Sequence, residues 1–208
     1  MLQYIAIIFL AYCIGSISFG VIFSKRFAGF DVRTTGSHGA GATNVLRSVG
    51  KKAAALTFLC DLLKGTAALA VAMFGALIWK DLDLVLLKYL AGLFVILGHT
   101  FPVFFGFRGG KGVASGLGVL LMLNWKIGML CFAAALALTL LTKMVSVGSI
   151  TAAALFPILI VFLAKETKTE AIILSIVIAL LIIFNHRPNI KRILTGKENK
   201  LKFKKSNK

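Results

Sequence analysis

The chain of 208 residues is too apolar and too basic for a soluble protein. Hydrophobic residues make up 59% of it and the mean hydropathy is +0.93, whereas soluble domains average about 45–50% apolar residues. Lys and Arg number 24 against 7 Asp and Glu, which gives a net charge of +17. The composition therefore excludes a soluble globule, a disordered tail and a disulfide-stapled secreted domain. It predicts an all-α, polytopic membrane protein.

Seven apolar segments follow one another along the chain, and each is a candidate helix. A helix needs about 20 apolar residues to cross a hydrocarbon core of about 30 Å. The segments cover residues 2–24, 53–79, 86–106, 112–124, 126–142, 146–164 and 170–185, and the fourth is too short to span unless helix continues through its flanks. We expect about seven transmembrane helices, with residues 1–198 as a single domain and 199–208 as a basic tail.

The basic residues are divided unequally between the connections. Eighteen Lys and Arg lie in residues 25–52, 107–111, 143–145 and from 186 onward, whereas five lie on the other side, which also carries Glu166. The positive-inside rule places the basic side in the cytoplasm, so the N-terminus is expected outside and the C-terminus in the cytoplasm of a multi-pass inner-membrane protein. Because membrane topology and anionic lipid explain most of this charge, we expect membrane lipids and no nucleic acid as partners.

Two sets of residues inside the apolar segments have structural interpretations. Cys13, Cys60 and Cys131 lack any metal-ligand spacing, so we interpret them as buried thiols and expect no metal and no cofactor. Asp61 and Lys64 lie one turn apart within a span. A lone charge there costs roughly 2.5–3.5 kcal/mol, and at this spacing the two charges can neutralise each other. We expect an intramembrane ion pair, with support of a site as the alternative.

Residues 31–47 form the first of three unusual cytoplasmic segments. Polar side chains alternate there with glycines: Gly36, Ser37, His38, Gly39, Gly41, Thr43 and Asn44, with Arg33 and Arg47 on either side. Such a backbone can turn its N–H groups toward an anion, and arginines can add bidentate contacts to phosphate oxygens. A flexible loop is the alternative interpretation.

Residues 98–112 form the second segment, which begins near His99. Three glycines, Gly109, Gly110 and Gly112, flank Lys111, and a helix is expected to begin directly afterwards. Its N-terminal dipole would add to the attraction of an anion. The pattern is not a P-loop, because Gly112 stands where a Ser or Thr is required. The alternative is a loop lysine that merely obeys the positive-inside rule.

The third segment, residues 185–198, follows the last apolar segment. A basic stop signal with a short interfacial helix would explain its charge, but His186, Asn189 and Glu198 are poor choices for anchoring alone. All three segments fall on the cytoplasmic side. Together they predict a site for an anion, most simply phosphate groups. Lipid-facing walls around this site suggest a substrate with an acyl tail.

These segments resemble the bacterial acyl-phosphate:glycerol-3-phosphate acyltransferase family. The matching stretches are GSHGAGATNVLR (36–47), GHTFPVFFGFRGGKGVASG (98–116) and HRPNIKRILTGKE (186–198), supported by GSISFG (15–20), DLLKG (61–65) and VSVGSI (145–150). The family usually reads Gly-Ser-Gly-Asn in the first loop, whereas His38-Gly39 follows Ser37 here. Arg108 replaces a more usual Lys, which keeps the charge.

The resemblance implies a fatty acyl phosphate as donor, glycerol 3-phosphate as acceptor, and lysophosphatidic acid and phosphate as products. It implies that a soluble enzyme forms the acyl phosphate, and that enzyme is a candidate partner whose contact the sequence does not show. The residues at family site positions are Ser37, Thr43, Asn44, Arg47, Lys111 with its glycines, His186, Asn189 and Glu198. An acyl phosphate is already activated, so we hypothesise direct, substrate-assisted attack without an acyl-enzyme. Lys111, Ser37 and backbone amides would stabilise developing charge, while Arg47, His186 and Asn189 would orient the acceptor.

Three other functions are weighed against this one. A transporter of a phosphorylated metabolite would use the same basic site, but the glycine-rich motifs have no second copy of the kind that transporter repeats show. A serine protease centred on Ser115 lacks the leading glycine of its motif. A non-catalytic scaffold would keep its complexes after the glycine-rich motifs are mutated.

Overall fold

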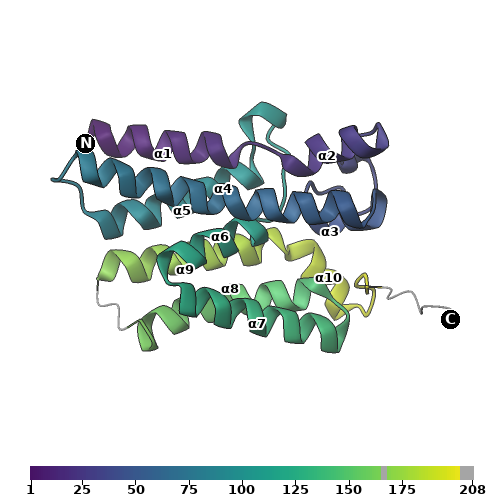
Figure 1. The fold of residues 1–208 in the computed structure, drawn as a ribbon. Coiled ribbons are helices and arrows are strands. Elements are labelled where there is room, and N and C mark those ends of the chain that lie inside the picture. Colours follow the sequence, from purple (N-terminus) through teal and green to yellow (C-terminus); the bar gives the residue numbers. More distant parts are fainter. Residues whose placement is uncertain (165–167, 202–208) are drawn as a thin grey trace.

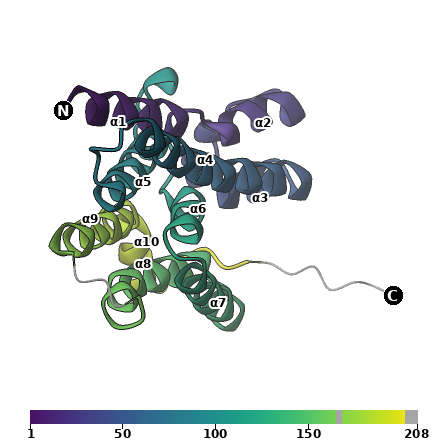
Figure 2. The same ribbon diagram turned by 60° about the vertical axis from the view of Figure 1, so that its left-hand side comes forward.

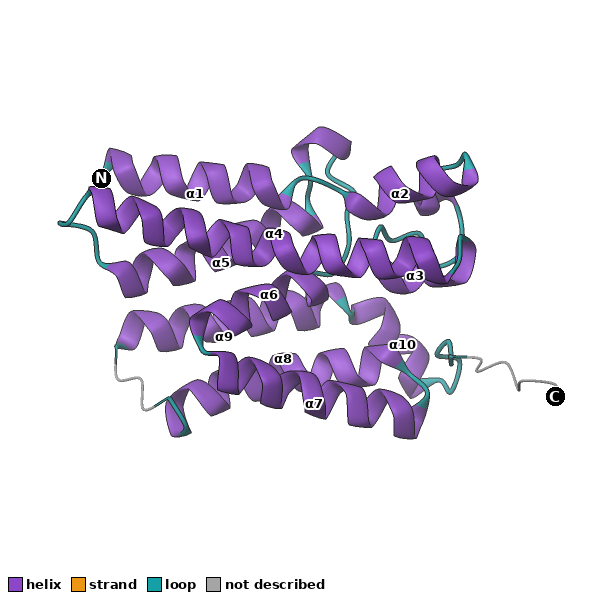
Figure 3. Ribbon diagram, in the orientation of Figure 1, coloured by secondary structure: helices purple, strands orange, loops and turns teal. Residues whose placement is uncertain are grey.

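The computed structural model describes residues 1–164 and 168–201, and within them it contains helices and loops without a strand (Figure 3). Lys165, Glu166 and the residues from Lys202 onward lie outside the described residues. Two short 3-10 helices are η1 (Val32–Thr34) and η2 (Val103–Phe105). The α-helices are α1 (Leu2–Gly15), α2 (Phe19–Ala28), α3 (Ala42–Ser48), α4 (Lys51–Ile78), α5 (Leu84–Thr100), α6 (Val113–Leu123), α7 (Trp125–Thr142), α8 (Val145–Phe162), α9 (Thr169–Asn185) and α10 (Arg187–Leu194).

The helices account for most, but not all, of the expected membrane crossings. In the described part of the chain, five stretches are long and apolar enough to span: Leu2–Ala28, Lys51–Ile78, Leu84–Phe105, Trp125–Thr142 and Val145–Phe162. Helices α9 and α10 give a sixth if their 58° bend lies within one span. Helix α6 has 11 residues and is about 16 Å long, which is too short to cross alone. The all-helical membrane architecture is confirmed, whereas a count of seven complete crossings is not.

The first apolar segment is two helices rather than one. Helix α1 ends at Gly15 and α2 begins at Phe19, so backbone carbonyls at the break lose their helical partners. The Lys64 ammonium donates to one of them, the carbonyl of Ile17, at 2.8 Å. A side chain buried in α4 therefore stabilises an irregular backbone at membrane depth, where an unpaired carbonyl is costly.

Helix α6 lies between two groups of helices, α1–α5 on one side and α7–α10 on the other (Figures 1 and 2). It crosses α4 closely because both helices present glycine at the crossing. A Cβ on Gly65 would collide with the carbonyl of Ser115, and one on Gly118 would collide with that of Leu62. Small residues of this kind let helix backbones approach in a membrane. The main apolar core includes residues from both groups and from α6.

Contacts between loops assign the connections to two ends of the molecule. At one end, the Tyr4 hydroxyl accepts a hydrogen bond from the Asp83 amide (2.7 Å), and Lys168 pairs with Asp83 (2.8 Å). At the other end, the Leu201 amide donates to the Lys143 carbonyl at 2.7 Å. The N-terminus and the C-terminal segment lie at opposite ends (Figure 1). This grouping matches the predicted division of the loops between the two sides of a membrane.

Candidate active site

The first glycine-rich loop is organised around one buried amide. Asn44, in the first turn of α3, donates to the carbonyls of Val32, Thr35 and Gly39 at 2.9–3.1 Å. Its Oδ1 accepts the backbone N–H of Ser37 at 3.0 Å. Because the amide is used within the loop, Asn44 fixes the loop's shape and thereby sets the position of Ser37.

The first and second glycine-rich loops are joined directly. The Ala40 amide donates to the Gly109 carbonyl at 3.1 Å. The Arg33 guanidinium donates to the carbonyls of Phe105 (2.5 Å) and Arg108 (2.9 Å). Two segments that are about 70 residues apart in sequence therefore form one rigid surface, in agreement with the expectation that they converge.

The second loop folds back on the end of α5. The Gly110 amide donates to the His99 carbonyl (3.0 Å) and the Gly109 amide to the Thr100 carbonyl (3.1 Å). The imidazole of His99 lies so close to the Gly110 Cα that a Cβ there would collide with its ring. Glycine is therefore required at position 110 by packing, and the packing fixes the backbone that carries Lys111.

Asp61 and Lys64 form the expected ion pair, which extends to His99. The Asp61 carboxylate lies 2.9 Å from the Lys64 ammonium and 3.5 Å from Nδ1 of His99, and all three side chains are buried. Asp61 and His99 line the site cavity, whereas Lys64 lies outside its wall. The expected ion pair is therefore present with Asp61 in the cavity wall, and His99 connects it to the second glycine-rich loop.

The third segment supplies a hydrogen-bonded network around Glu198. Lys111 donates to Oδ1 of Asn189 at 2.5 Å, and Nδ2 of Asn189 donates to Glu198 at 2.7 Å. Ser146 (2.9 Å) and Arg192 (2.8 Å) also donate to the Glu198 carboxylate. The carboxylate is therefore engaged by protein groups, and it positions Asn189 and Ser146.

Burial and hydrogen bonds determine the protonation states of Lys111 and Glu198. Burial lowers the pKa of Lys111 from 10.5 to about 8, although the nearby Glu198 carboxylate opposes the change. Burial alone would raise the pKa of Glu198, but hydrogen bonds from Asn189, Ser146 and Arg192 outweigh it and leave that pKa below its ordinary value. At neutral pH the site therefore combines a partly desolvated ammonium with an ionised, fully bonded carboxylate.

His186 lies at the junction of α9 and α10 and is buried. Its Nδ1 is 2.8 Å from the carbonyl of Ile182. A carbonyl only accepts, so Nδ1 carries a hydrogen. In the neutral ring Nε2 is then a hydrogen-bond acceptor, which suits it to a hydroxyl in the cavity that it lines.

These elements enclose one polar cavity of about 580 Å³. Most of the predicted site residues line it: Ser37, Thr43, Asn44, Arg47, Asp61, His99, Gly109, Gly110, Lys111, His186, Asn189 and Glu198. Gly36 and Gly112 do not line it. Their positive φ angles of +62° and +86° show that they are needed for the loop backbone instead. Val113 and Ala114 of α6 also line the cavity, so the positive end of the α6 dipole faces it.

Several residues of the cavity wall were absent from the predicted site, and four polar ones lie near helix ends. Ser146 and Ser149 in the first turns of α8 line it, as do Thr100 and Asn185, which are joined by a 3.1 Å hydrogen bond between the ends of α5 and α9. The sequence pattern that could have identified these four residues is a polar side chain at the end of an apolar segment, next to a motif that was recognised. Among the described residues no group of three or more His, Cys, Asp or Glu is arranged to hold a metal ion.

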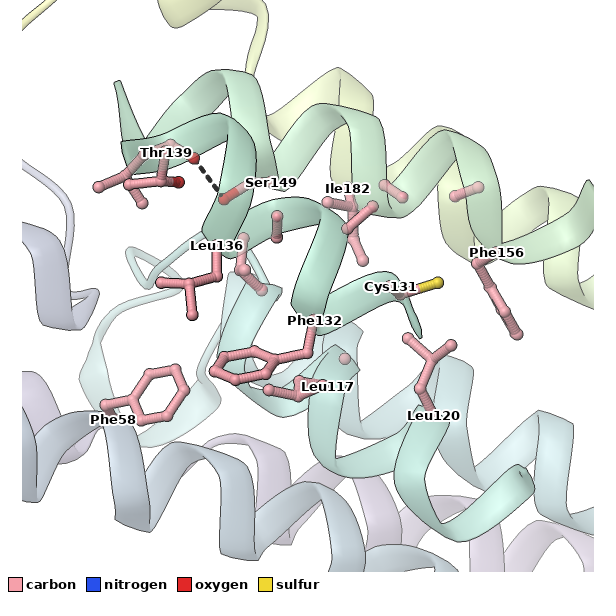
Figure 4. Close-up of a pocket in the computed structure, with 17 residues that line it drawn as sticks. Phe58, Leu117, Leu120, Cys131, Phe132, Leu136, Thr139, Ser149, Phe156 and Ile182 are labelled. Atoms are coloured by element: carbon pink, nitrogen blue, oxygen red, sulfur yellow. Dashed lines mark hydrogen bonds between the residues drawn. The ribbon is translucent and has the colours of Figure 1, made fainter. Parts of the chain in front are cut away.

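A second, apolar cavity of about 180 Å³ lies between α4, α6, α7, α8 and α9 (Figure 4). It shares Phe58, Val113, Val145 and Ser149 with the polar cavity, so the two cavities adjoin each other. The remaining lining is almost entirely hydrocarbon and includes Leu117, Leu120, Phe132, Leu136, Phe156 and Ile182. The combined space suits a molecule with an anionic head and an apolar chain.

The fold and site define an integral membrane protein with a binding site for an amphiphilic anion. The family model named glycerol-3-phosphate acyltransferase matches residues 5–196. Glycerol-3-phosphate acyltransferases of Clostridioides difficile (strain 630) and Fusobacterium nucleatum are 43% and 42% identical over 203 and 202 residues, covering 98% and 97% of this chain and 98% and 100% of theirs. The chain belongs to the glycerol-3-phosphate acyltransferase family.

Two solved structures agree with this assignment. Both are crystal structures of PlsY (YgiH), described as an integral membrane glycerol 3-phosphate acyltransferase, and both are 38% identical to this chain. The glycerol 3-phosphate form has a TM-score of 0.85 and the lysophosphatidic acid form 0.81. Each covers 96% of this chain, which covers 96% and 95% of those chains.

Proposed function

We propose that this protein transfers a fatty acyl group from acyl phosphate to the 1-hydroxyl of glycerol 3-phosphate, the first step of phospholipid synthesis. Its products would be lysophosphatidic acid and phosphate. The observation that carries the proposal is a polar cavity lined by Lys111 and Arg47 that adjoins an apolar groove. Family membership supports the acceptor and the product, and the chemistry of the cavity supports a phosphate leaving group.

The proposed reaction is a direct displacement. The acceptor's 1-hydroxyl oxygen attacks the acyl carbonyl carbon, the bond from that carbon to the phosphate oxygen breaks, and the hydroxyl proton passes to a phosphate oxygen. Negative charge develops on the carbonyl oxygen and on the departing phosphate. Lys111, the Ser37 hydroxyl and the N–H groups at the start of α6 would stabilise this charge without rearranging, because the surrounding hydrogen bonds hold them in place.

Other residues that line the same cavity would hold the acceptor. Arg47 can contact its phosphate through two N–H groups. Nε2 of His186 would accept a hydrogen bond from a glycerol hydroxyl. Asn189, whose amide bonds to Lys111 and Glu198, would help to orient the acceptor by holding the Lys111 ammonium in place. His99, Thr43 and the glycines complete the binding surface. Asn44 and Glu198 act as positioning residues, because their polar atoms already bond to neighbouring protein groups.

Two further statements belong to the proposal. The site end of the molecule faces the cytoplasm of the inner membrane, because the excess of basic residues predicts that side. A soluble enzyme would deliver the acyl phosphate there. Residues 1–198 would form the acyltransferase domain, followed by the basic tail 199–208.

The proposal is tested by supplying purified protein in lipid with glycerol 3-phosphate and either acyl phosphate or acyl-CoA. We expect lysophosphatidic acid to form when acyl phosphate is the donor and not when acyl-CoA is, and we expect the Lys111→Met variant not to form it. Transfer from acyl-CoA would overturn the donor. Glycerol phosphate entry into liposomes by a protein that makes no lipid product would favour the transporter.

A further inference from the structure

The apolar groove has one open edge and one closed end. Phe132 and Leu136 of α7 are partly exposed along the open edge, with Leu136 at 46%. At the other end, Leu120, Cys131 and Phe156 are at most 8% exposed. Figure 4 shows Leu136 on one side of the groove, and Cys131, Leu120 and Phe156 together on the opposite side. An acyl chain that entered the groove from the side of the polar cavity would therefore meet a wall of buried side chains.

The groove's length can be read from the face of α8 that lines it. Val145 and Ser149 lie where the two cavities join, and Ala152, Ala153 and Phe156 follow along the same face. Eleven residues separate Val145 from Phe156, which is about 16 Å of helix at 1.5 Å per residue. An extended acyl chain advances about 1.25 Å per methylene, given a carbon–carbon bond of about 1.5 Å. The groove therefore holds about 13 carbons counted from Val145, and about 8 counted from Ser149, which is seven positions before Phe156.

Several small side chains line the groove, whereas Leu120 and Phe156 close its end together with Cys131. Gly116, Ala135, Ala152 and Ala179 lie along its course. Phe156 is 1% exposed and belongs to the main core, which fixes its ring in place. A close-packed wall does not yield to an extra methylene without displacing its neighbours.

We propose that Phe156 and Cys131 form the end wall of the acyl site and set the length of the acyl chain that is transferred. This inference rests on the proposed function, because it assigns the groove to the donor's acyl chain. A chain that reaches the wall gains the full contact of the groove. A longer one must push its end out through the open edge beside Phe132, losing contact with the buried wall.

Two substitutions move the wall in opposite directions. Phe156→Leu shortens the side chain and should lengthen the preferred acyl chain by about two carbons. Cys131→Met extends into the groove and should shorten the preferred chain by a similar amount. Because one methylene in an apolar pocket changes specificity about tenfold or more, we expect the ratio of kcat/KM for 18-carbon and 14-carbon acyl phosphates to rise about tenfold in Phe156→Leu. It should fall about tenfold in Cys131→Met.

Matched controls carry the same changes outside the groove. Phe162 is on α8 and 74% exposed, so Phe162→Leu repeats the Phe-to-Leu change on the outer surface. Ala133 is exposed on α7 and does not line the groove, so Ala133→Met introduces the same methionine there. Both controls should keep the wild-type ratio.

The experiment measures kcat/KM for acyl phosphates of 12, 14, 16 and 18 carbons in all five proteins. In parallel, non-transferable alkyl phosphates of these lengths are tested for thermal stabilisation. Opposite shifts of the preferred length in both measurements support the proposal. Unshifted profiles in folded, active variants would overturn it and would mean that the chain leaves by the open edge. A shifted alkyl phosphate profile without acyl transfer would overturn the proposed reaction while supporting the end wall.

Discussion

Replacing Lys111 with methionine tests the electrostatic basis of the proposed reaction. The ammonium is half-buried, donates to Asn189 at 2.5 Å and lies in the wall of the polar cavity. Methionine has nearly the same length and flexibility but carries no charge and no donor. The α6 N-terminus and the glycine-rich backbone would remain, because neither depends on the lysine head group.

The size of the expected loss follows from the role of the ammonium. Removing one preorganised donor from a developing oxyanion costs about 10²–10³ in kcat, which is about 2.7–4 kcal/mol. We therefore expect kcat of Lys111→Met to fall by at least about 100-fold. The pKa of Lys111, lowered to about 8 by burial, adds a second signature. The ammonium is present below pH 8 and is lost above it, so activity should fall as pH rises through 8.

The assay is the pH dependence of kcat/KM, which reports ionisation of the free enzyme, together with Lys111→Arg. Arginine keeps the charge and does not lose its proton in this range. Any activity that Lys111→Arg retains should therefore lack the decline near pH 8. A wild-type profile that stays level to pH 10, or a methionine variant within about threefold of wild type, would refute the assigned role.

Three further predictions concern the supports of the site. Lys64→Met should destabilise the protein by about 3–5 kcal/mol because it removes the ammonium partner of the buried Asp61 carboxylate, while Asp61→Asn with Lys64→Met should restore part of that loss; equal unfolding of single and double variants in a thermal melt would contradict this. Gly110→Ala should push the His99 ring and lower kcat/KM, and an unchanged value would exclude the packing argument. Glu198→Gln should lower the free energy of unfolding by about 1.5–3 kcal/mol at neutral pH. Because the pKa of Glu198 is lowered in the folded protein, wild type should be more stable than Glu198→Gln above pH 4.5, and the difference in stability should vanish at lower pH. A stability difference that does not depend on pH would contradict a role for the ionised carboxylate.

The sequence predicted the helical architecture because hydrophobic segments of membrane length leave few alternatives. It could not give the number of complete crossings. The sequence marks residues 112–124 as too short to span unless helix continues through the flanks, and only the structure shows that helix α6 ends at Val113 and Leu123. The break between α1 and α2 was equally hidden, since it depends on Lys64 meeting the Ile17 carbonyl from another helix.

The candidate site was predictable to the extent that its residues depart from the surrounding hydrocarbon. Lys111, Arg47 and His186 stand out for that reason and line the cavity. The roles of individual residues within the site could be assigned only from the structure. Asn44 looks like a ligand in sequence, but its amide bonds to four backbone groups of its own loop. The apolar groove could not be foreseen at all, because its lining residues look like any other lipid-facing or core residues.

The most direct test of the account is a rapid-quench single turnover with labelled acyl phosphate and glycerol 3-phosphate. Direct attack within one cavity predicts that lysophosphatidic acid and phosphate appear at the same rate and in equal amounts, with no label on the protein at any time. Phosphate release before lipid product, with acyl label trapped on a side chain, would contradict the direct transfer.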